Sequence, residues 1–532
     1  MRTAPVAARN GARGTGPSRR RIHLDTDVLI AGGGLAGLYA AYELKKRHPG
    51  LRVRLVEMLS RIGGRVQTDE MLAGAFRAEY GAVRIEPDLQ PLVDAFVQAL
   101  GVPVQPISSH EAGSSIRPCA AKLTEDERAL LADPRAHDPP WALLMHAVRV
   151  IVADQWDLDG DRFDRPGRAE ALARFRTHAQ FGGMPLYQQG IWNVLSNVLS
   201  HEAVEFTREK GAFYNFKNAN PNAAEWIATL LDLRLLERPS YLPVGGMQTL
   251  IDYAGRAVRA LGVDVVVDHA LVDLSEQPDG AIAATIEDVS TAERRRVVVR
   301  CGRVVLALPQ RPLRALARCL PPAVTASLDA VVPFPIAWAC CVVEDPWWNA
   351  DTPPGSGEGA MVRAAHFEVH PSQPERYGMA MFYSDEPWHQ YWANLIDTEE
   401  GRRGWQSAPY RNRGERLKAA LVRTLQQTFS RDDTPRILEW GIRDWSMAPF
   451  GAGVHFWRPG YRSADVIRQL AAFGIGADPA NRRVHICGEA YSDLQGFFEG
   501  ACRSVQCMLQ QIDAQNGTEK HNATTESSNE AA

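Results

Sequence analysis

Long apolar runs and paired metal-binding or redox cysteines are missing from this sequence. No stretch of 18 apolar residues occurs in the 532-residue chain, so we expect no membrane-spanning helix and no membrane partner. The eight cysteines include no CxxC pair and no His-rich partner motif, which argues against a zinc site and against a redox dithiol. The simplest interpretation is a cytoplasmic protein whose thiols are free and buried.

Charge gives little reason to expect a macromolecular partner. Lys and Arg (59) and Asp and Glu (63) leave a formal net charge of −4, so no nucleic-acid partner is expected. A basic leader, residues 1–24, and a polar tail, residues 513–532, have compositions typical of disorder. The leader is superficially similar to a twin-arginine export signal, but residues 27–44 after it carry a cofactor motif rather than a removable segment.

Residues 27–57 have the pattern of a dinucleotide-binding unit. A short apolar strand, a glycine turn and an Ala-rich helix are followed by a second strand that ends at Glu57. Gly32 and Gly34 let the backbone approach a pyrophosphate, and Gly37 lets the helix lie close to the sheet. Glu57 stands where a carboxylate accepts hydrogen bonds from a ribose. The predicted contacts from this unit are Gly32, Gly34, Leu35, Ala36, Gly37 and Glu57.

Further motifs indicate which dinucleotide is bound. They are RIGGRVQT (61–68), EYGAVRI (79–85), LPVGGMQTL (242–250), RVVLALP (303–309) and GEAYSDLQGFFEG (488–500). With them, residues from about 26 to 512 resemble the flavin amine oxidase superfamily, and more narrowly its branch of L-amino-acid oxidases and tryptophan monooxygenases. The resemblance implies FAD rather than NAD.

The resemblance also implies a fold. It is an α/β fold with a discontinuous, Rossmann-like FAD-binding domain, a mixed-sheet substrate domain and a helical cap, known as the amine oxidase fold. The FAD-binding domain takes residues 25–85, 239–313 and 446–512. Residues 86–238 form the helical cap with the first part of the substrate domain, and residues 314–445 form its second part.

Most of the cofactor contacts are implied by this family likeness. Glu489 is expected to bind the ribityl or phosphate region of FAD, and a helix that starts near Gly496 to direct its positive end at the flavin pyrimidine ring. Val265–Val267 cover the strand whose backbone pairs with adenine, and Val266 is the central choice. The stretch GAGVHFW (451–457) has no cysteine, so FAD is expected to bind non-covalently. The implied contacts are Arg61, Gly63, Gly64, Arg65, Ala82, Val83, Val266, Gly488, Glu489, Gly496 and Phe497.

Arg84 is the residue that points to an amino acid as substrate. In the related amino-acid oxidases an arginine at this place binds the substrate carboxylate, a planar anion that a guanidinium group matches with two hydrogen bonds. The alternative is an ordinary ion pair of Arg84 with Glu79 or Glu86.

The amine end of the site is carried by other residues. Gly496 and Phe497 are expected to contact the substrate amine and to form one aromatic wall. His455 is expected either as a second wall residue or as a hydrogen-bonded core residue.

One position departs from the family pattern. Trp338 stands where a lysine near flavin N5 is usual, which leaves the electron acceptor open, and Tyr383 is a candidate to assist the carboxylate clamp. The implied reaction transfers a hydride from the α-carbon of an L-amino acid to flavin N5. The products are a 2-oxo acid, ammonia and, with oxygen as acceptor, hydrogen peroxide. The alternatives are an amino-acid 2-monooxygenase, a monoamine or polyamine oxidase, and an idle FAD-binding protein. The substrate side chain and the oligomeric state stay open, a homodimer included.

Overall fold

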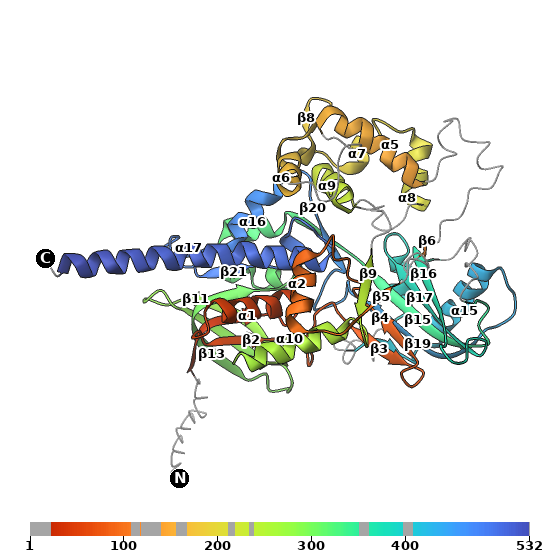
Figure 1. Cartoon of the computed structure of the whole chain (residues 1–532), viewed down its shortest axis with the longest axis horizontal. Coiled ribbons are helices and arrows are strands. Elements are labelled where there is room, and N and C mark those ends of the chain that lie inside the picture. Colours follow the sequence, from red (N-terminus) through yellow and green to blue (C-terminus); the bar gives the residue numbers. More distant parts are fainter. Residues whose placement is uncertain are drawn as a thin grey trace, which may run out of the picture.

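Two larger β-sheets and a group of helices organise the chain (Figure 1). The computed structural model describes residues 23–107, 117–118, 140–155, 167–210, 219–233, 239–349, 361–396 and 408–530. Most of the predicted basic leader lies outside the described residues, and its last two residues, His23 and Leu24, belong to the first strand.

The first sheet is mixed and takes its strands from three separate stretches of the chain. Its order is β10-β2-β1-β13-β12-β11, and β21 also pairs with β13. The pairs of β1 with β2 and β13, of β2 with β10 and of β13 with β21 are parallel, whereas β12 is antiparallel to both its neighbours. The strands are β1 (His23–Ala31), β2 (Val53–Val56), β10 (Asp264–Val266), β11 (His269–Glu276), β12 (Ile282–Asp288), β13 (Arg296–Leu306) and β21 (Val484–Ile486).

Helices cover both faces of this sheet, which explains the nearly continuous apolar run in β1. Val28 and Ile30 pack on one side, and Leu29 and Ala31 pack on the other, as alternation along a strand requires. The first side is covered by α1 (Leu35–Arg47), α2 (Pro91–Leu100), α10 (Gln248–Ala260) and α17 (Phe498–Glu530). The second is covered by α11 (Gln310–Ala315), α12 (Pro322–Leu328) and α16 (Ser463–Ala471).

The second sheet is antiparallel in all its strand pairs within the described chain. Along its central strand β15, Trp338 and Cys340 face one core, and Ala339 and Cys341 face the core beneath helix α15 (Glu415–Phe429). The strand order is β18 (Tyr410–Arg411), β19 (Arg436–Asp444), β15 (Ala337–Glu344), β17 (Tyr377–Ser384), β16 (Ala364–Val369) and β6 (Arg117–Pro118).

A helical cap lies over the open face of the second sheet and shares its core (Figure 1). Leu143, Phe175 and Ile227 from three cap helices belong to the same apolar cluster as Trp338. The cap helices are α5 (Pro140–Val152), α6 (Arg168–His178), α7 (Ile191–Leu195), α8 (His201–Lys210) and α9 (Ala223–Leu233).

Short strand pairs and one short helix connect these parts. They are β3 (Thr68–Met71) with β4 (Phe76–Glu79), β5 (Val104–Ile107) with β9 (Ser240–Pro243), β7 (Gln180–Phe181) with β8 (Met184–Pro185), β14 (Val331–Phe334) with β20 (Val454–Trp457), and α13 (His389–Ala393).

Helix α17 includes most of the predicted polar tail. Residues 513–530 continue α17 as far as Glu530, and this helix extends beyond the body of the molecule in Figure 1. The sequence signal for disorder was the lack of large apolar groups, but extending a helix that is already packed needs no new nucleation. The buried start of α17 therefore supplies the nucleus that the tail lacks by itself.

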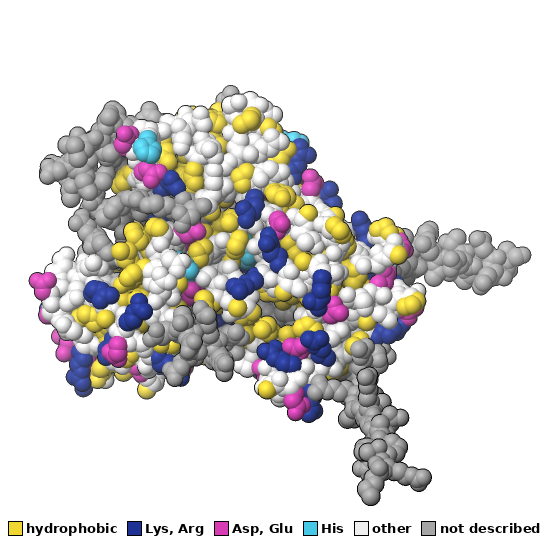
Figure 2. Space-filling view, turned by 180° about the vertical axis from the view of Figure 1, so that it is seen from behind, with side chains coloured by type: hydrophobic (Ala, Val, Ile, Leu, Met, Phe, Trp, Pro, Cys, Tyr) yellow, Lys and Arg dark blue, Asp and Glu magenta, His cyan; other side chains and the backbone are white. Residues whose placement is uncertain are grey.

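The surface and the cysteines agree with the composition. Five of the seven described cysteines are buried, and all seven are free. Among the described residues, no helix has both the length and the apolar character needed to cross a bilayer. Figure 2 shows hydrophobic side chains interspersed with charged ones over one face of the molecule.

A close backbone contact at Gly37 gives a first test. A Cβ atom on Gly37 would lie 1.9 Å from the carbonyl oxygen of Gly32, which directly follows β1. To avoid this clash, the backbone of helix α1 or of the glycine turn would have to move. We expect Gly37→Ala to lower the free energy of unfolding by about 3 kcal/mol, measured by urea denaturation. Gly50→Ala is the matched control, because nothing lies within 4 Å of its Cβ position. Equal stability of the two variants would contradict this packing.

Candidate active site

A cavity of about 1170 Å³ runs along the carboxyl ends of β1 and β2 and continues beneath the cap and the second sheet. It is lined by residues from all three stretches that build the first sheet and by residues of the cap. Sequence reasoning placed many of these residues in the site: Gly32, Gly34, Leu35, Ala36, Glu57, Gly63, Gly64, Arg65, Ala82, Val83, Arg84, Gly488, Glu489, Gly496 and Phe497 all line it. Gly37, Arg61, Val266 and His455 do not.

Two glycine turns lie against each other at one end of the cavity. Gly34 and Gly63 form a parallel bridge, and the amide of Gly63 donates to the carbonyl of Gly33 at 2.8 Å. Gly63 has a φ of +119°, a conformation that favours glycine. Helix α1 begins directly after Gly34 without a side-chain cap, so its first N–H groups are available to an anion.

Glu57 holds the glycine turn in place as well as facing the cavity. Its Oε2 accepts from the amide of Gly33 at 2.7 Å, and its Oε1 accepts from the amide of Leu59 at 2.8 Å. Burial raises the pKa of Glu57, against the opposing effect of these two amides. The position matches the predicted ribose contact, and the carboxylate has acceptor capacity left for hydroxyl groups.

Val266, the predicted adenine contact, does not line the cavity. The carbonyl of Val266 accepts from the amide of Glu57 at 2.9 Å, and β10 is paired with β2, so this backbone is committed to the sheet. The cavity is lined instead by His269–Val272 of β11, which is the edge strand at the opposite side of the sheet from β10. An edge strand leaves alternate N–H and C=O groups free to pair with a planar base.

Arg61 stabilises its own loop and does not line the cavity. Its Nη1 donates to the carbonyl of Val66 at 2.9 Å, and its Nη2 donates to that of Gly64 at 2.8 Å. Burial lowers the pKa of Arg61 to about 10, with Glu57 acting in the opposite direction. Arg61 is predicted to contact FAD, but it does not line the cavity, and its guanidinium group donates to carbonyl groups of its own turn.

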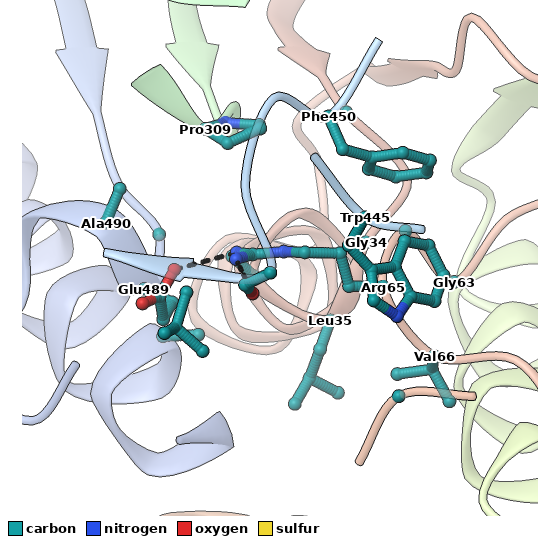
Figure 3. Close-up of a pocket in the computed structure, with 18 of the residues that line it drawn as sticks. Gly34, Leu35, Gly63, Arg65, Val66, Pro309, Trp445, Phe450, Glu489 and Ala490 are labelled. Atoms are coloured by element: carbon teal, nitrogen blue, oxygen red, sulfur yellow. Dashed lines mark hydrogen bonds and ion pairs between the residues drawn. The ribbon is translucent and has the colours of Figure 1, made fainter. Parts of the chain in front are cut away.

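Arg65 and Glu489 connect the first and last stretches of the chain across the cavity. Figure 3 shows the Arg65 side chain reaching from its loop to the Glu489 carboxylate, and the Nη2–Oε2 distance is 2.9 Å. Glu489 Oε1 accepts from the amides of His455 (3.0 Å) and Gly496 (2.9 Å), and Oε2 also contacts His455 Nδ1 at 3.1 Å. Four protein groups thus occupy this carboxylate.

This arrangement gives Glu489 a structural role as well and places His455 among the buried residues. Glu489 lines the cavity, and its four protein contacts hold the turn in place, while its predicted contact with the cofactor stays a prediction. His455, with its side chain 1% exposed, lies behind Glu489 as a hydrogen-bonded core residue and not on the cavity wall. Burial alone would raise the pKa of Glu489, but the charges of Arg65 and His455 outweigh it and lower this pKa to about 2.

The C-terminal turn otherwise lies as expected. Gly488 has a φ of +132°, Gly496 and Phe497 line the cavity, and α17 begins at Phe498 beside them. Its second residue, Glu499, turns away and accepts from two amides at the start of α2.

Arg84 faces the cavity and keeps one ion pair. Its Nε donates to Glu86 Oε1 at 2.7 Å, the contact that the sequence left open as an alternative, whereas Glu79 is buried elsewhere beside Met247. Both Arg84 and Glu86 line the cavity, and the Arg84 side chain is 35% exposed. Within the described chain, no other ion pair or hydrogen bond engages the two terminal nitrogens of Arg84.

Aromatic side chains form one wall of the cavity, and the sequence analysis predicted only some of them. Trp338 and Tyr383 pack edge to face at a centroid distance of 5.0 Å, and so do Trp445 and Phe450 at 4.9 Å. Figure 3 shows the second pair close to the Arg65 loop, and the Trp445 indole donates to the carbonyl of Tyr80. Sequence reasoning missed Trp445 and Phe450, because 13 tryptophans in the chain make packing the default; their closeness to GAGVHFW was the available signal.

The walls and donors of the cavity fit a dinucleotide. The volume exceeds that of an ordinary small-ligand pocket, and one end offers a glycine turn, an uncapped helix start and the Glu57 carboxylate. The other end offers aromatic walls and the cap residues Leu144, Thr207, Trp226 and Leu230. Among the described residues, no cluster of three or more His, Cys, Asp or Glu could hold a metal ion.

Comparison with known proteins agrees with this geometry. A family model described as "Flavin containing amine oxidoreductase" matches residues 35–505. An L-amino-acid oxidase of Siganus canaliculatus is 42% identical over 85 residues, 16% of each chain, and an uncharacterised mimivirus protein, R188, is 32% identical over 84 residues, also 16% of each. These two matches thus span 16% of the relatives' length. Achacin of Lissachatina fulica is 24% identical over 476 residues, 82% of this chain and 84% of achacin.

Solved structures match over nearly the whole chain. Wild-type putrescine oxidase bound to putrescine superposes with a TM-score of 0.61 at 17% identity, covering 93% of this chain and 100% of the other. A redesigned triple mutant of putrescine oxidase gives a TM-score of 0.62 at 16% identity. The predicted amine oxidase fold is therefore confirmed.

The buried Glu489 network has a measurable pH dependence. Its pKa of about 2 lies below the ordinary 4.5, so its stabilising effect is complete above about pH 5 and is lost as the pH falls toward 2. We expect Glu489→Gln to lower the free energy of unfolding by about 3 kcal/mol at pH 7, and this deficit to shrink by about 1 kcal/mol at pH 4. Urea denaturation at both pH values measures it.

A surface carboxylate provides the control for this experiment. Glu205 pairs with Arg208 one helical turn away and is 37% exposed, so Glu205→Gln is expected to change stability by less than about 0.5 kcal/mol. A Glu489→Gln deficit that stays constant from pH 7 to pH 4 would contradict the lowered pKa.

Proposed function

The chain belongs to the flavin containing amine oxidoreductases, and we propose that its substrate is an L-amino acid, oxidised at the α-carbon. The observation that carries the proposal is Arg84, which lines the cavity and whose two terminal nitrogens have no ion pair or hydrogen bond within the described chain. A guanidinium group presented to a substrate cavity is a specific partner for a carboxylate. A simple amine has no group that would use it.

The cofactor is FAD, held without a covalent link in the proposed enzyme. The uncapped start of α1 and the turns at Gly34 and Gly63 would hold its pyrophosphate, Glu57 its ribose and β11 its adenine. When bound, FAD would supply the two-electron chemistry as the acceptor of a hydride. The residues from Gly488 to Phe497 would place the flavin end beneath the cap.

The protein contributes position and exclusion of water. Arg84 binds the substrate carboxylate in two parallel hydrogen bonds, which fixes the rotation of the α-carbon. Trp445 and Phe450 form an apolar wall, and the cap residues Trp226 and Leu230 close the cavity from above. A dry pocket favours the neutral amine over the ammonium ion, so no side-chain base is required once this proton has left.

The products follow from the chemistry of the substrate. Loss of a hydride from the α-carbon gives an imino acid, which water hydrolyses to a 2-oxo acid and ammonia. Oxygen is the proposed final acceptor, reduced to hydrogen peroxide. No described lysine lines the cavity, and Trp338 stands at the place where such a lysine is usual. Formation of an amide and carbon dioxide instead would identify a monooxygenase.

Replacement of Arg84 tests the proposal. We expect Arg84→Ala to weaken binding of the L-amino acid that reduces the wild-type flavin by about 100-fold, because two charge-assisted hydrogen bonds are lost. Arg84→Lys keeps the charge without the planar fork, and an intermediate loss of about tenfold is expected. Anaerobic stopped-flow absorbance of the flavin gives the dissociation constant and the limiting rate separately.

Two results would overturn this assignment. Arg77→Ala, on the exposed side of β4, is the control and should behave as the wild type, with unchanged FAD content. An Arg84→Ala variant that binds the amino acid within threefold of the wild type would exclude the clamp. A flavin that neither amino acids nor amines reduce would favour the idle FAD-binding protein.

A further inference from the structure

Arg84 and Glu86 lie on one side of a firmly held extended segment. Between them, Ile85 is fully buried and exchanges two main-chain hydrogen bonds with Tyr241, each 2.9 Å long. Alternate residues of an extended chain point to the same side, so Arg84 and Glu86 both face the cavity while Ile85 faces the core.

The backbone after Glu86 is held equally well. The carbonyl of Glu86 accepts from the amides of Leu89 (3.0 Å) and Gln90 (2.8 Å), which forms the turn into α2. Glu499 then accepts from the amides of Leu92 and Val93 at the start of that helix. The Glu86 carboxylate therefore extends from a fixed base toward Arg84.

The contact between the two side chains selects one edge of the guanidinium group. A guanidinium group can bind a carboxylate in two hydrogen bonds either through Nε and one terminal nitrogen or through both terminal nitrogens. Nε of Arg84 is occupied by Glu86 Oε1 at 2.7 Å, and Glu86 is itself only 16% exposed. The end edge, Nη1 and Nη2, is what remains for a substrate.

We propose that Glu86 is a positioning residue that fixes Arg84 so that its end edge receives the substrate carboxylate. This inference rests on the proposed function, because it assumes that Arg84 binds a carboxylate. Glu86 acts through Arg84 and does not touch the reacting atoms. Arg84, Ile85 and Glu86 are consecutive, so the positioning contact is local to three residues of the chain.

Two neutral replacements separate positioning from charge. Glu86→Gln removes the negative charge but keeps an oxygen that can accept from Nε, whereas Glu86→Ala removes both. Loss of one such hydrogen bond from Nε to a neutral oxygen corresponds to about a three- to tenfold difference in affinity. We expect benzoate, a carboxylate that undergoes no oxidation, to bind Glu86→Ala three- to tenfold more weakly than Glu86→Gln. Perturbation of the absorbance of bound FAD measures its dissociation constant.

The same experiment needs two reference variants. Arg84→Ala is expected to abolish benzoate binding. Asp433→Ala is the matched control, because Arg431 Nε donates to Asp433 Oδ1 at 2.8 Å, also two residues apart, on an exposed surface. It should bind benzoate as the wild type does. With an L-amino acid as reductant, Glu86→Ala should raise the dissociation constant and change the limiting rate of flavin reduction by less than twofold.

The possible outcomes identify which idea fails. Equal affinity of the Gln and Ala variants, with binding lost in Arg84→Ala, would overturn the role of Glu86 and leave the clamp intact. Unchanged benzoate affinity in Arg84→Ala, or no binding by the wild type, would overturn both. The expected benzoate affinities together with a flavin that no L-amino acid reduces would support the positioning and contradict the proposed reaction.

Discussion

A single buried carboxylate, Glu489, joins the parts of the chain on which the cavity depends. It contacts Arg65 from the first stretch, His455 from β20 and the amide of Gly496 from its own turn. Burying this charge without partners would be strongly unfavourable, so all three must be in place together. The position of the C-terminal turn, and with it Phe497 and the start of α17, follows from this one interaction.

The opposite end of the cavity depends on close backbone contact rather than on charge. The turns that contain Gly34 and Gly63 touch directly, and helix α1 lies against β1 because Gly37 has no side chain. Such contacts leave main-chain N–H groups facing the cavity instead of side chains. One end is therefore suited to phosphates, and the other, with Trp445 and Phe450, to an apolar and water-poor reaction.

The sequence predicted best what local geometry decides. Glycine positions such as Gly32, Gly37 and Gly488 follow from steric rules that hold within a few residues, and the structure places them as expected. The partners of a buried polar side chain depend on how its whole loop folds, so the motif around Arg61 could not reveal that its guanidinium group donates to the carbonyls of Gly64 and Val66.

Other departures have the same origin. Val266 is the last residue of β10 and lies three residues before His269, where the strand that lines the cavity begins. This difference in position depends on how β10 pairs with β2. Trp445 carries no local pattern that separates a cavity wall from core packing. Helix α17 runs through the polar tail because its buried start provides the nucleus, which composition alone does not show.

The central claim is that the substrate is chosen by its carboxylate, and a pair of substrates that differ only in this group tests it most directly. Wild-type protein loaded with FAD would be mixed anaerobically with an apolar L-amino acid, such as L-phenylalanine or L-leucine, and with the amine that lacks its carboxylate. If Arg84 binds the substrate carboxylate, the amino acid should reduce the flavin at concentrations at least about 100-fold lower than those that the amine requires. Equal or faster reduction by the amine would contradict the account and assign the chain to the amine oxidases.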